Sequence, residues 1–482
     1  MILHFDGKIV QDYTDGKRLV RERVAVSINL EKENTLLGIP FCTDSTGESQ
    51  SEAIKELIVQ YELKDKIKGL VFDTTSTNTG KENGVCARIS NYLQQPILYL
   101  ACRHHVYECH IKNVSKIYRK TCGPEHPLFK RLYDEWPNIT IDQSRLTRYT
   151  YGESAILDFE ARSSLDFLKV SLRDGKIPLG NYRELAELVI FFLSPNSKDL
   201  KIRMPGAISH ARFMSQAIYF MKLKIMNRQL AFINTNALKC EINEMSEFIA
   251  LFYAKWFIRS SVSKISPRVD LESIWEMKGY RKIRPEISNK CIASISNHLW
   301  YLHPTVIPFC LLDENVIEKE KREVCSALLN IMGQKENSFK YEKIKMEPCI
   351  NIKKKVRPSL SKFIDKSSLL IFDILGHDSE RLEWLQLPSK SWPLMSAFRE
   401  FRDFVKNIPV VNDSAERNVA LLKSFISTST DESLRQDLFL SIEKKRKDDK
   451  KRRDEKKIKN AEKRRNEKKS KDDTKFNQNL ED

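Results

Sequence analysis

Two acidic residues lie where apolar runs of the sequence could bring them together. Asp6 falls within the apolar run of residues 2–10, and Asp73 directly follows the apolar run of residues 67–72. If these runs form neighbouring strands, both carboxylates project near one edge of a sheet, and a divalent cation would relieve their repulsion. An Asp at the end of a strand is also a common turn or capping residue. The pair therefore predicts either a metal site or a turn.

The densest group of thiol and imidazole side chains is Cys102, His104, His105, Cys109 and His110. Cysteine and histidine bind zinc, but helical spacing after His105 turns His110 to a different face from Cys102, and the sequence has no second Cys-x-x-Cys pair. The alternative is a set of half-buried histidines at the start of a helix. The spacing favours this alternative over zinc.

Basic and aromatic residues are interleaved between residues 203 and 224. Such interleaving suits a helix face that contacts phosphates. A solvated face of an ordinary helix explains the pattern equally well. The basic members are Arg203, His210, Arg212, Lys222 and Lys224, and the aromatic members are Phe213, Tyr219 and Phe220.

The end of the chain carries most of its excess charge. Residues 444–475 contain 18 Lys and Arg against 8 Asp and Glu, which places +10 of the net charge of +17 in a short tail. A solvent-exposed charged helix, partly disordered, would have this pattern. The basic clusters also suit phosphate contacts and nuclear import, and their members include Lys444, Lys445, Arg446, Arg452 and Arg453.

The first 120 residues contain the elements that would position Asp6 and Asp73. Alternating β-branched runs at 2–10, 23–30 and 32–42 predict three antiparallel strands. A helix over 51–62 then leads to a buried strand at 67–72, a helix at about 81–93 and another buried strand at 97–101. The predicted order is three strands, a helix, a strand, a helix, a strand and a helix.

Beyond residue 121 the period of the apolar residues becomes helical. Helices are expected within 185–193, 207–228, 241–258 and 291–302, and the polar segment 335–359 reads as a loosely packed connection. Helical patterning returns at 395–405, 413–425 and 432–442.

Composition excludes several classes of protein. With 41% hydrophobic residues among 482, only 15 Gly and 17 Pro, the chain is neither wholly disordered nor fibrous. Its longest apolar runs are far shorter than a membrane span, and no secretion signal is expected at its start. Ten scattered cysteines read as reduced thiols in the cytosol or nucleus.

Five runs of sequence together resemble the hAT superfamily of cut-and-paste DNA transposases, and more closely a set of transposase-derived proteins of invertebrate type. The resemblance extends over residues 1–440. Such transposases usually carry an N-terminal zinc finger domain, for which this sequence shows no counterpart; the resemblance therefore implies a truncated copy, a partial gene model or a domesticated descendant. The runs are LHFDGK, FDTTSTNTG, LACRHHVYE, MPGAISHARFMSQAIY and SAERNVALL.

The resemblance assigns roles to individual residues. It implies that Asp6, Asp73 and Glu416 form a DDE triad holding two Mg²⁺ or Mn²⁺ ions, which activate the attacking water or hydroxyl and stabilise the leaving oxygen. His105, with His104 as its companion, matches the family histidine beside the scissile DNA. Arg212 and Lys222 match the region of an Arg-Trp motif, although Phe213 stands in the place of the Trp. Asn78 and Cys102 match supporting positions.

The resemblance also implies a domain plan and a function. A ribonuclease-H-like mixed five-stranded sheet is expected over 1–120, an all-helical insertion over 121–395, the rest of the ribonuclease-H-like domain with Glu416 over 396–443, and a basic tail over 444–482. The implied protein is nuclear, binds DNA and an import receptor, allows homo-oligomers and enters no membrane. It either cleaves and transfers DNA strands or serves as a catalytically silent DNA-binding and oligomerisation module.

Overall fold

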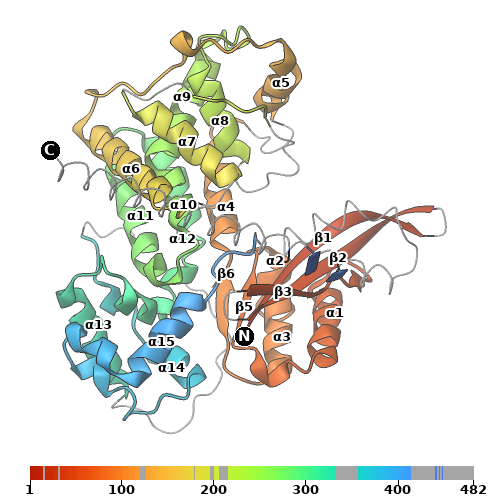
Figure 1. Cartoon of the computed structure of the whole chain (residues 1–482), viewed down its shortest axis with the longest axis vertical. Coiled ribbons are helices and arrows are strands. Elements are labelled where there is room, and N and C mark those ends of the chain that lie inside the picture. Colours follow the sequence, from red (N-terminus) through yellow and green to blue (C-terminus); the bar gives the residue numbers. More distant parts are fainter. Residues whose placement is uncertain are drawn as a thin grey trace, which may run out of the picture.

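The computed structural model describes residues 1–14, 17–30, 33–119, 126–177, 180–195, 200–205, 215–332 and 356–413, together with residues 440, 441, 444, 445 and 448. Figure 1 shows a sheet with helices α1 to α3 on one side of the molecule and a helical body on the other. Helix α4 (Arg103–Ser115) leaves the end of the sheet and runs into the helical body. The chain is therefore a mixed α/β protein with a large helical part.

The sheet has six strands in the order β3-β2-β1-β5-β6, with β4 paired to β2. Strands β1, β2 and β3 are antiparallel to one another, whereas β5 pairs with β1 and β6 pairs with β5 in parallel. This succession agrees with the strand order expected from the sequence. The bounds are β1 (Ile2–Thr14), β2 (Lys17–Leu30), β3 (Glu33–Gly38), β4 (Phe41–Cys42), β5 (Gly69–Phe72) and β6 (Leu98–Ala101).

The expectation of five strands is wrong by one. The predicted third strand, residues 32–42, is divided into β3 and the two-residue β4, which pairs with Glu22 and Arg23 of β2. Pro40 lies between the two pieces, and a proline has no backbone N–H to donate to a strand ladder. Its carbonyl instead accepts a hydrogen bond from the Val24 N–H at 3.2 Å.

Alternation along each strand gives the sheet two different apolar faces. One face, with Phe5 and Phe72, packs on helices α1 (Gly47–Gln60) and α3 (Val85–Leu93). The Thr46 side chain caps α1 by accepting a hydrogen bond from the Ser49 N–H. The opposite face contributes Ile2, Val71 and Leu100 to the core of the helical body. The sheet therefore lies between two layers of helices.

The helical body has one continuous apolar core. The expected helix over 241–258 is present, interrupted by a π-helical turn at Ile249–Tyr253. The expected connection at 335–359 lies largely outside the described residues. The helices are α5 (Pro127–Glu135), α6 (Ala155–Arg173), α7 (Asn181–Leu193), α8 (Ser215–Ile225), α9 (Asn236–Phe248), α10 (Ala254–Arg259), α11 (Ser266–Tyr280), α12 (Pro285–Ser296), α13 (Glu318–Met332), α14 (Leu370–Ile374) and α15 (Ser396–Asn407).

Helix α15 belongs to the helical body and not to the sheet layer. Its Phe398 and Phe401 rings lie 5.1 and 5.8 Å from the ring of Trp384, and Phe401 also contacts Phe372. The chain reaches the sheet only at Val410, whose carbonyl accepts a hydrogen bond at the start of α4. The apolar stripe of α15 therefore packs on tryptophan and phenylalanine rings of the helical body, and the domain boundary expected at residue 396 stays a prediction.

Among the described helices, none combines the length and the hydropathy that crossing a lipid bilayer requires.

Candidate active site at the carboxyl edge of the sheet

Asp6 and Asp73 lie at corresponding places on two neighbouring strands. Strands β1 and β5 are paired in parallel up to His4 and Val71. Asp6 lies two residues beyond His4 within β1, and Asp73 lies two residues beyond Val71, directly after the end of β5. Adjacent strands are about 4.8 Å apart, so the backbones at Asp6 and Asp73 are at about the same level of the sheet. The convergence of their carboxylates on one metal stays a prediction.

Ring packing supports this register one residue past the ladder. The rings of Phe5 and Phe72 are stacked with centroids 6.3 Å apart, on the face covered by α1 and α3. Asp6 follows Phe5 and Asp73 follows Phe72, so alternation turns both carboxylates to the other face, toward the helical body. Asp6 is 5% exposed, while Asp73 is half-buried at the sheet rim.

The carboxylate of Asp73 is held by the turn that follows β5. Its Oδ1 accepts hydrogen bonds from the Thr75 N–H at 3.1 Å, the Thr75 hydroxyl at 2.7 Å and the Asn78 Nδ2 at 2.6 Å. Asp73 is thus a turn residue, as the alternative interpretation held, and Asn78 supports it as the resemblance implied. All three contacts converge on Oδ1, and no hydrogen bond from the described residues reaches Oδ2.

Asn412 joins the end of the described chain to β1. Its Nδ2 donates to the Phe5 carbonyl at 2.7 Å, and its Oδ1 lies 3.2 Å from His4 Nδ1. Burial lowers the pKa of His4 to about 4, so the ring is neutral near pH 7 and donates from Nδ1 to the amide oxygen. Residues separated by more than 400 positions are therefore adjacent at this edge.

The start of α4 also contacts residues 408–413, the segment in which the chain returns to the sheet; it is called the returning segment below. Cys102 is buried, and its Sγ accepts a hydrogen bond from the Asn412 N–H at 3.2 Å. The Arg103 N–H donates to the Val410 carbonyl at 2.9 Å. The supporting position assigned to Cys102 is thus filled by a side chain that contacts the protein backbone.

His104 is bound by protein groups at the carboxyl edge. It is 1% exposed, its Nδ1 lies 2.7 Å from Asp413 Oδ1, and its ring stacks on Phe257 with centroids 4.3 Å apart. The Tyr182 hydroxyl lies 3.1 Å from the same Nδ1 and donates to Asp413 Oδ2. The ring is thus enclosed between helices and residues 408–413, an environment that favours a structural role for His104; its contact with DNA stays a prediction.

The remaining residues expected to contact DNA fall into three groups. His105 is half-buried near the start of α4, beside His298, whose pKa is lowered by burial and by this neighbour. Lys444 and Lys445 are helical and exposed. The other expected DNA contacts, Arg212, Arg446, Arg452 and Arg453, lie outside the described residues. Glu416, the third member of the expected triad, lies outside them too.

Lys222 is not available to a phosphate. Its side chain is buried, and its Nζ lies 2.8 Å from Glu184 Oε1 and donates to the Arg203 carbonyl at 2.8 Å. Burial lowers the pKa of Lys222, partly offset by Glu184. These contacts favour a structural role for Lys222, because the basic side chain pairs with a carboxylate on α7 instead of facing solvent.

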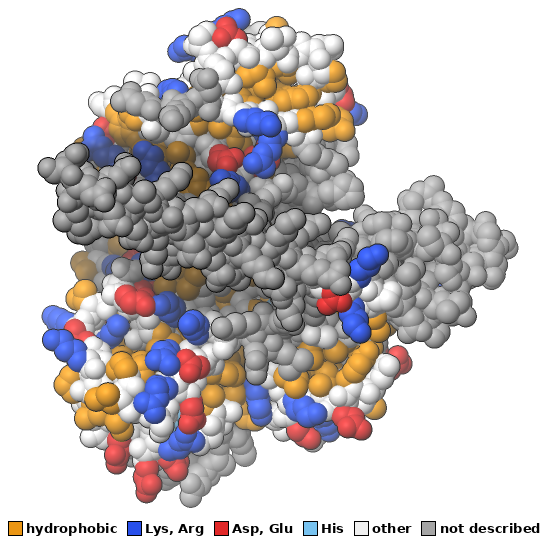
Figure 2. Space-filling model, in the orientation of Figure 1, with side chains coloured by type: hydrophobic (Ala, Val, Ile, Leu, Met, Phe, Trp, Pro, Cys, Tyr) orange, Lys and Arg blue, Asp and Glu red, His pale blue; other side chains and the backbone are white. Residues whose placement is uncertain are grey.

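The surface of the described residues carries mixed charge. On the face shown in Figure 2, Lys and Arg side chains are interspersed with Asp and Glu side chains, so the coloured part of this face forms no continuous basic surface. Electrostatic attraction to nucleic acid is therefore expected chiefly from the tail, where the sequence concentrates positive charge.

Metal-binding groups are absent from the part of the chain that the structure describes. No set of three or more His, Cys, Asp or Glu side chains there is arranged to hold an ion. The zinc alternative finds no support in the contacts of its members, because Cys102 contacts Asn412, His104 contacts Asp413, and His110 lies 2.9 Å from Ser294 Oγ. The triad cannot be assembled from the described residues alone, since Glu416 is not among them.

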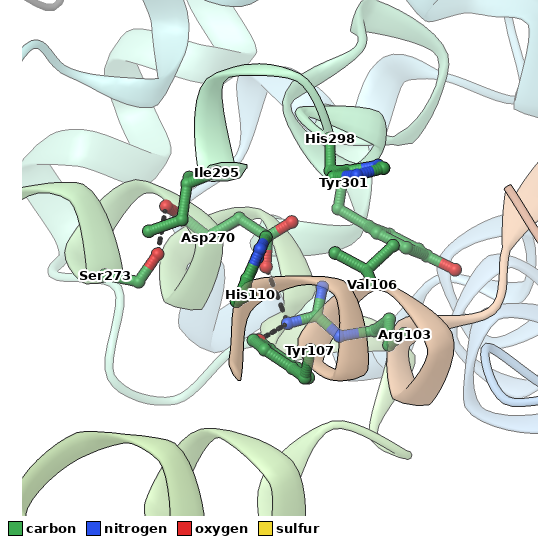
Figure 3. Close-up of a pocket in the computed structure, with 9 residues that line it drawn as sticks. All are labelled: Arg103, Val106, Tyr107, His110, Asp270, Ser273, Ile295, His298 and Tyr301. Atoms are coloured by element: carbon green, nitrogen blue, oxygen red, sulfur yellow. Dashed lines mark hydrogen bonds and ion pairs between the residues drawn. The ribbon is translucent and has the colours of Figure 1, made fainter. Parts of the chain in front are cut away.

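A second polar cluster lies inside the molecule where α4, α11 and α12 meet (Figure 3). Arg103 Nη2 lies 2.6 Å from Asp270 Oδ1 and donates to the Tyr107 hydroxyl at 2.6 Å. Asp270 raises the pKa of Arg103 in spite of burial, which alone would lower it. The cavity beside them, lined also by His110 and His298, has a volume of about 10 Å³, about the size of one water molecule. This cluster is therefore structural.

Three residues at the carboxyl edge were not singled out from the sequence. Asn412 and Asp413 directly precede the run SAERNVALL that carries the resemblance, and this was their only signal. Tyr182 has no neighbouring motif, and only the packing of α7 on α4 and α10 places it here.

Comparison of the sequence with models of known protein families found no match, and comparison with curated proteins found none either. The function is therefore argued from the residues and contacts of this chain.

Proposed function

We propose that this protein is a transposase-derived DNA-binding protein of the hAT type, whose sheet carries a site for metal-dependent cleavage and transfer of DNA strands. The observation that carries the proposal is that Asp6 lies within β1 at the level where the neighbouring parallel strand β5 ends, and that Asp73 directly follows β5. Two carboxylates from adjacent strand ends are a natural cradle for a divalent cation.

The strand order supports a ribonuclease-H-like fold interrupted by a helical insertion. Three antiparallel strands precede two parallel ones, and the chain leaves the sheet through α4 and returns at Val410. In the returning segment, Asn412 contacts Phe5 of β1 and Cys102, which directly follows β6. Glu416 follows this segment by three residues in the sequence. An insertion that preserved the catalytic edge would have to return the chain to this edge.

The donor set fits Mg²⁺ or Mn²⁺. Asp73 has one oxygen anchored by three hydrogen bonds, and its other oxygen accepts none from the described residues. Asp6, Asp73 and Glu416 are the residues that would hold the ion, which when bound supplies charge stabilisation and an activated oxygen nucleophile. Asn78 and Thr75 orient the Asp73 carboxylate before any ion arrives.

DNA is the proposed partner, with the nucleus as the proposed location. The exposed Lys444 and Lys445 begin a tail that carries +10 of the net charge, and such a tail would neutralise phosphates and present basic clusters to an import receptor. Homo-oligomerisation remains part of the proposal through the resemblance alone.

The proposal is tested by Mn²⁺-dependent nicking of supercoiled DNA. Asp73→Asn should abolish nicking while DNA binding is retained or strengthened, because removing a negative charge from the site lessens its repulsion of phosphate. Asp142→Asn is the matched control, since Asp142 accepts from the Ser144 N–H at 2.9 Å and the Ser144 hydroxyl at 2.7 Å in a similar turn. Equal loss in both variants would show that Asp73 acts only as a turn residue.

The alternative is a catalytically silent DNA-binding and oligomerisation module that keeps the fold. The observation on its side is that Asp73 is held by the turn contacts of Thr75 and Asn78, which a residue without a catalytic role would also make. Retention of DNA binding by a wild-type protein that never nicks DNA with Mn²⁺ or Mg²⁺ would select this alternative.

A further inference from the structure

Three side chains from distant parts of the chain meet beside the carboxyl edge. His104 comes from α4, Tyr182 from α7 and Asp413 from the returning segment. Both carboxylate oxygens of Asp413 are engaged, Oδ1 by the imidazole and Oδ2 by the phenol. The Phe257 ring of α10 forms the apolar wall on which His104 stacks.

Two consecutive residues of the returning segment are attached to different parts of the molecule. Asn412 is bound to β1 through the Phe5 carbonyl and His4, which belong to the sheet. Asp413 is bound to Tyr182, which belongs to the helical body. A change in the position of α7 relative to the sheet would therefore act directly on the chain at Asp413.

We infer that Asp413 is a positioning residue, which uses its paired contacts with His104 and Tyr182 to hold the returning segment at the carboxyl edge, so that the helical body controls the site at Asp6 and Asp73. The inference rests on the proposed function, because Glu416 follows Asp413 by three residues in the sequence. It goes beyond that function by assigning control of the site to a contact made by the helical body.

A carboxylate that is held at both oxygens, as Asp413 is, has a defined position and direction. A half-buried carboxylate is costly unless its oxygens are hydrogen-bonded, so both contacts are retained together. Hydrogen bonds to an ionised group are about twice as strong as neutral ones. Loss of the Tyr182 hydroxyl removes the contact between Asp413 and α7, so the segment is held less firmly to the helical body.

The first measurement is amide hydrogen exchange of the full chain. Tyr182→Phe keeps the ring against His104 and Phe257 but removes the hydroxyl, so the fold is preserved. The N–H groups of Asn412 and Arg103, which bind the Cys102 sulfur and the Val410 carbonyl, report on the segment. Their exchange should become about ten-fold faster, as expected when one hydrogen bond of a local opening unit is lost.

The matched control is Tyr118→Phe. The Tyr118 hydroxyl donates to Glu244, which gives the same kind of phenol–carboxylate contact away from the sheet edge. This variant should leave exchange at Asn412 and Arg103 unchanged. Equal exchange in Tyr182→Phe and Tyr118→Phe would overturn the inference.

The second measurement is the Mn²⁺ concentration that gives half-maximal nicking. Asp413→Asn and Tyr182→Phe should raise it about ten-fold or more, because residues that orient metal ligands typically change affinity by such factors. A purely structural role would lower the amount of active protein without moving the half-saturating concentration, and that result would also overturn the inference.

The two measurements separate this inference from the proposed function. If the wild-type protein neither nicks DNA nor binds Mn²⁺ in calorimetry, the proposed function fails and control of a metal site fails with it. The exchange result still decides whether Asp413 holds the returning segment to the helical body.

Discussion

Removing the charge of Asp270 should destabilise the whole protein, because it leaves a buried guanidinium without its partner. Arg103 is 2% exposed and Asp270 12% exposed, and their Nη2 and Oδ1 atoms are 2.6 Å apart. The cation also lies over the rings of Tyr107 and Tyr301, at 5.4 and 4.7 Å from their centroids. The guanidinium is therefore shielded from bulk water, and the small cavity beside it offers room for about one water molecule at most.

The expected cost of Asp270→Asn is about 3–5 kcal/mol, the range found when one member of a buried pair is removed. This is a large part of the 5–15 kcal/mol that typically separates folded from unfolded domains. Since Arg103 begins α4 and Asp270 lies on α11, the loss should loosen the attachment of the sheet to the helical body.

Urea unfolding followed by circular dichroism measures this cost. The midpoint should fall while its slope stays constant, which is the signature of a change in stability alone. Glu135→Gln is the matched control, because Arg131 Nε and Glu135 Oε1 are also 2.6 Å apart but are 57% and 41% exposed. An exposed pair of this kind contributes less than about 0.5 kcal/mol.

Equal shifts of the midpoint in Asp270→Asn and Glu135→Gln would refute the reasoning, since they would show that burial does not set the strength of the pair. The double variant Arg103→Met with Asp270→Leu provides a further check. Replacing both charges by apolar groups should recover most of the lost stability, because no unpaired charge then remains.

Three other predictions concern pH, a buried lysine and the tail. Burial lowers the pKa of His4 and His298 to about 4. As the pH falls below about 6.5, the unfolded chain therefore binds protons at these histidines before the folded protein does. The free energy of unfolding should fall between about pH 6.5 and pH 4, by up to about 1.4 kcal/mol per pH unit for each histidine. His298→Gln should flatten this fall in urea midpoints, and an unchanged slope would contradict it. Lys222→Ala should lower stability by about 3–5 kcal/mol, because Glu184 loses its partner, but leave the DNA affinity of the folded protein unchanged in filter binding. Deleting residues 444–482 should leave the melting temperature nearly constant and reduce the salt dependence of DNA binding, whereas an identical slope would show that the tail makes no phosphate contacts.

Local patterns in the sequence were enough to predict most of the sheet. Apolar residues alternate around Asp6, which predicted its place within a strand. A continuous apolar run precedes Asp73, which predicted its place directly after a buried strand. The parallel pairing of β1 with β5 was expected from strand order, and the structure bears it out. Pro40 shows the limit of such patterns, since it divided a predicted strand in two.

The place where the chain returns to the sheet, residues 408–413, could not be located from the period of apolar residues. Helix α15 has a strong apolar stripe that would suit either layer, and only the rings of Trp384 and Phe372 decide that it joins the helical body. The same holds for Lys222, which resembles a surface lysine in sequence but is paired with Glu184 inside the molecule.

The sequence by itself determined most of the strands, their order along the chain, and the positions of Asp6 within β1 and Asp73 directly after β5, because these features depend on neighbours along the chain. The tertiary structure alone decided which distant side chains meet at that edge. Asn412 and Asp413 lie between 231 and 408 residues from these partners, and contacts over such separations depend on the packing of every intervening helix. The contact of Asp413 with Tyr182 therefore has no counterpart in any local pattern.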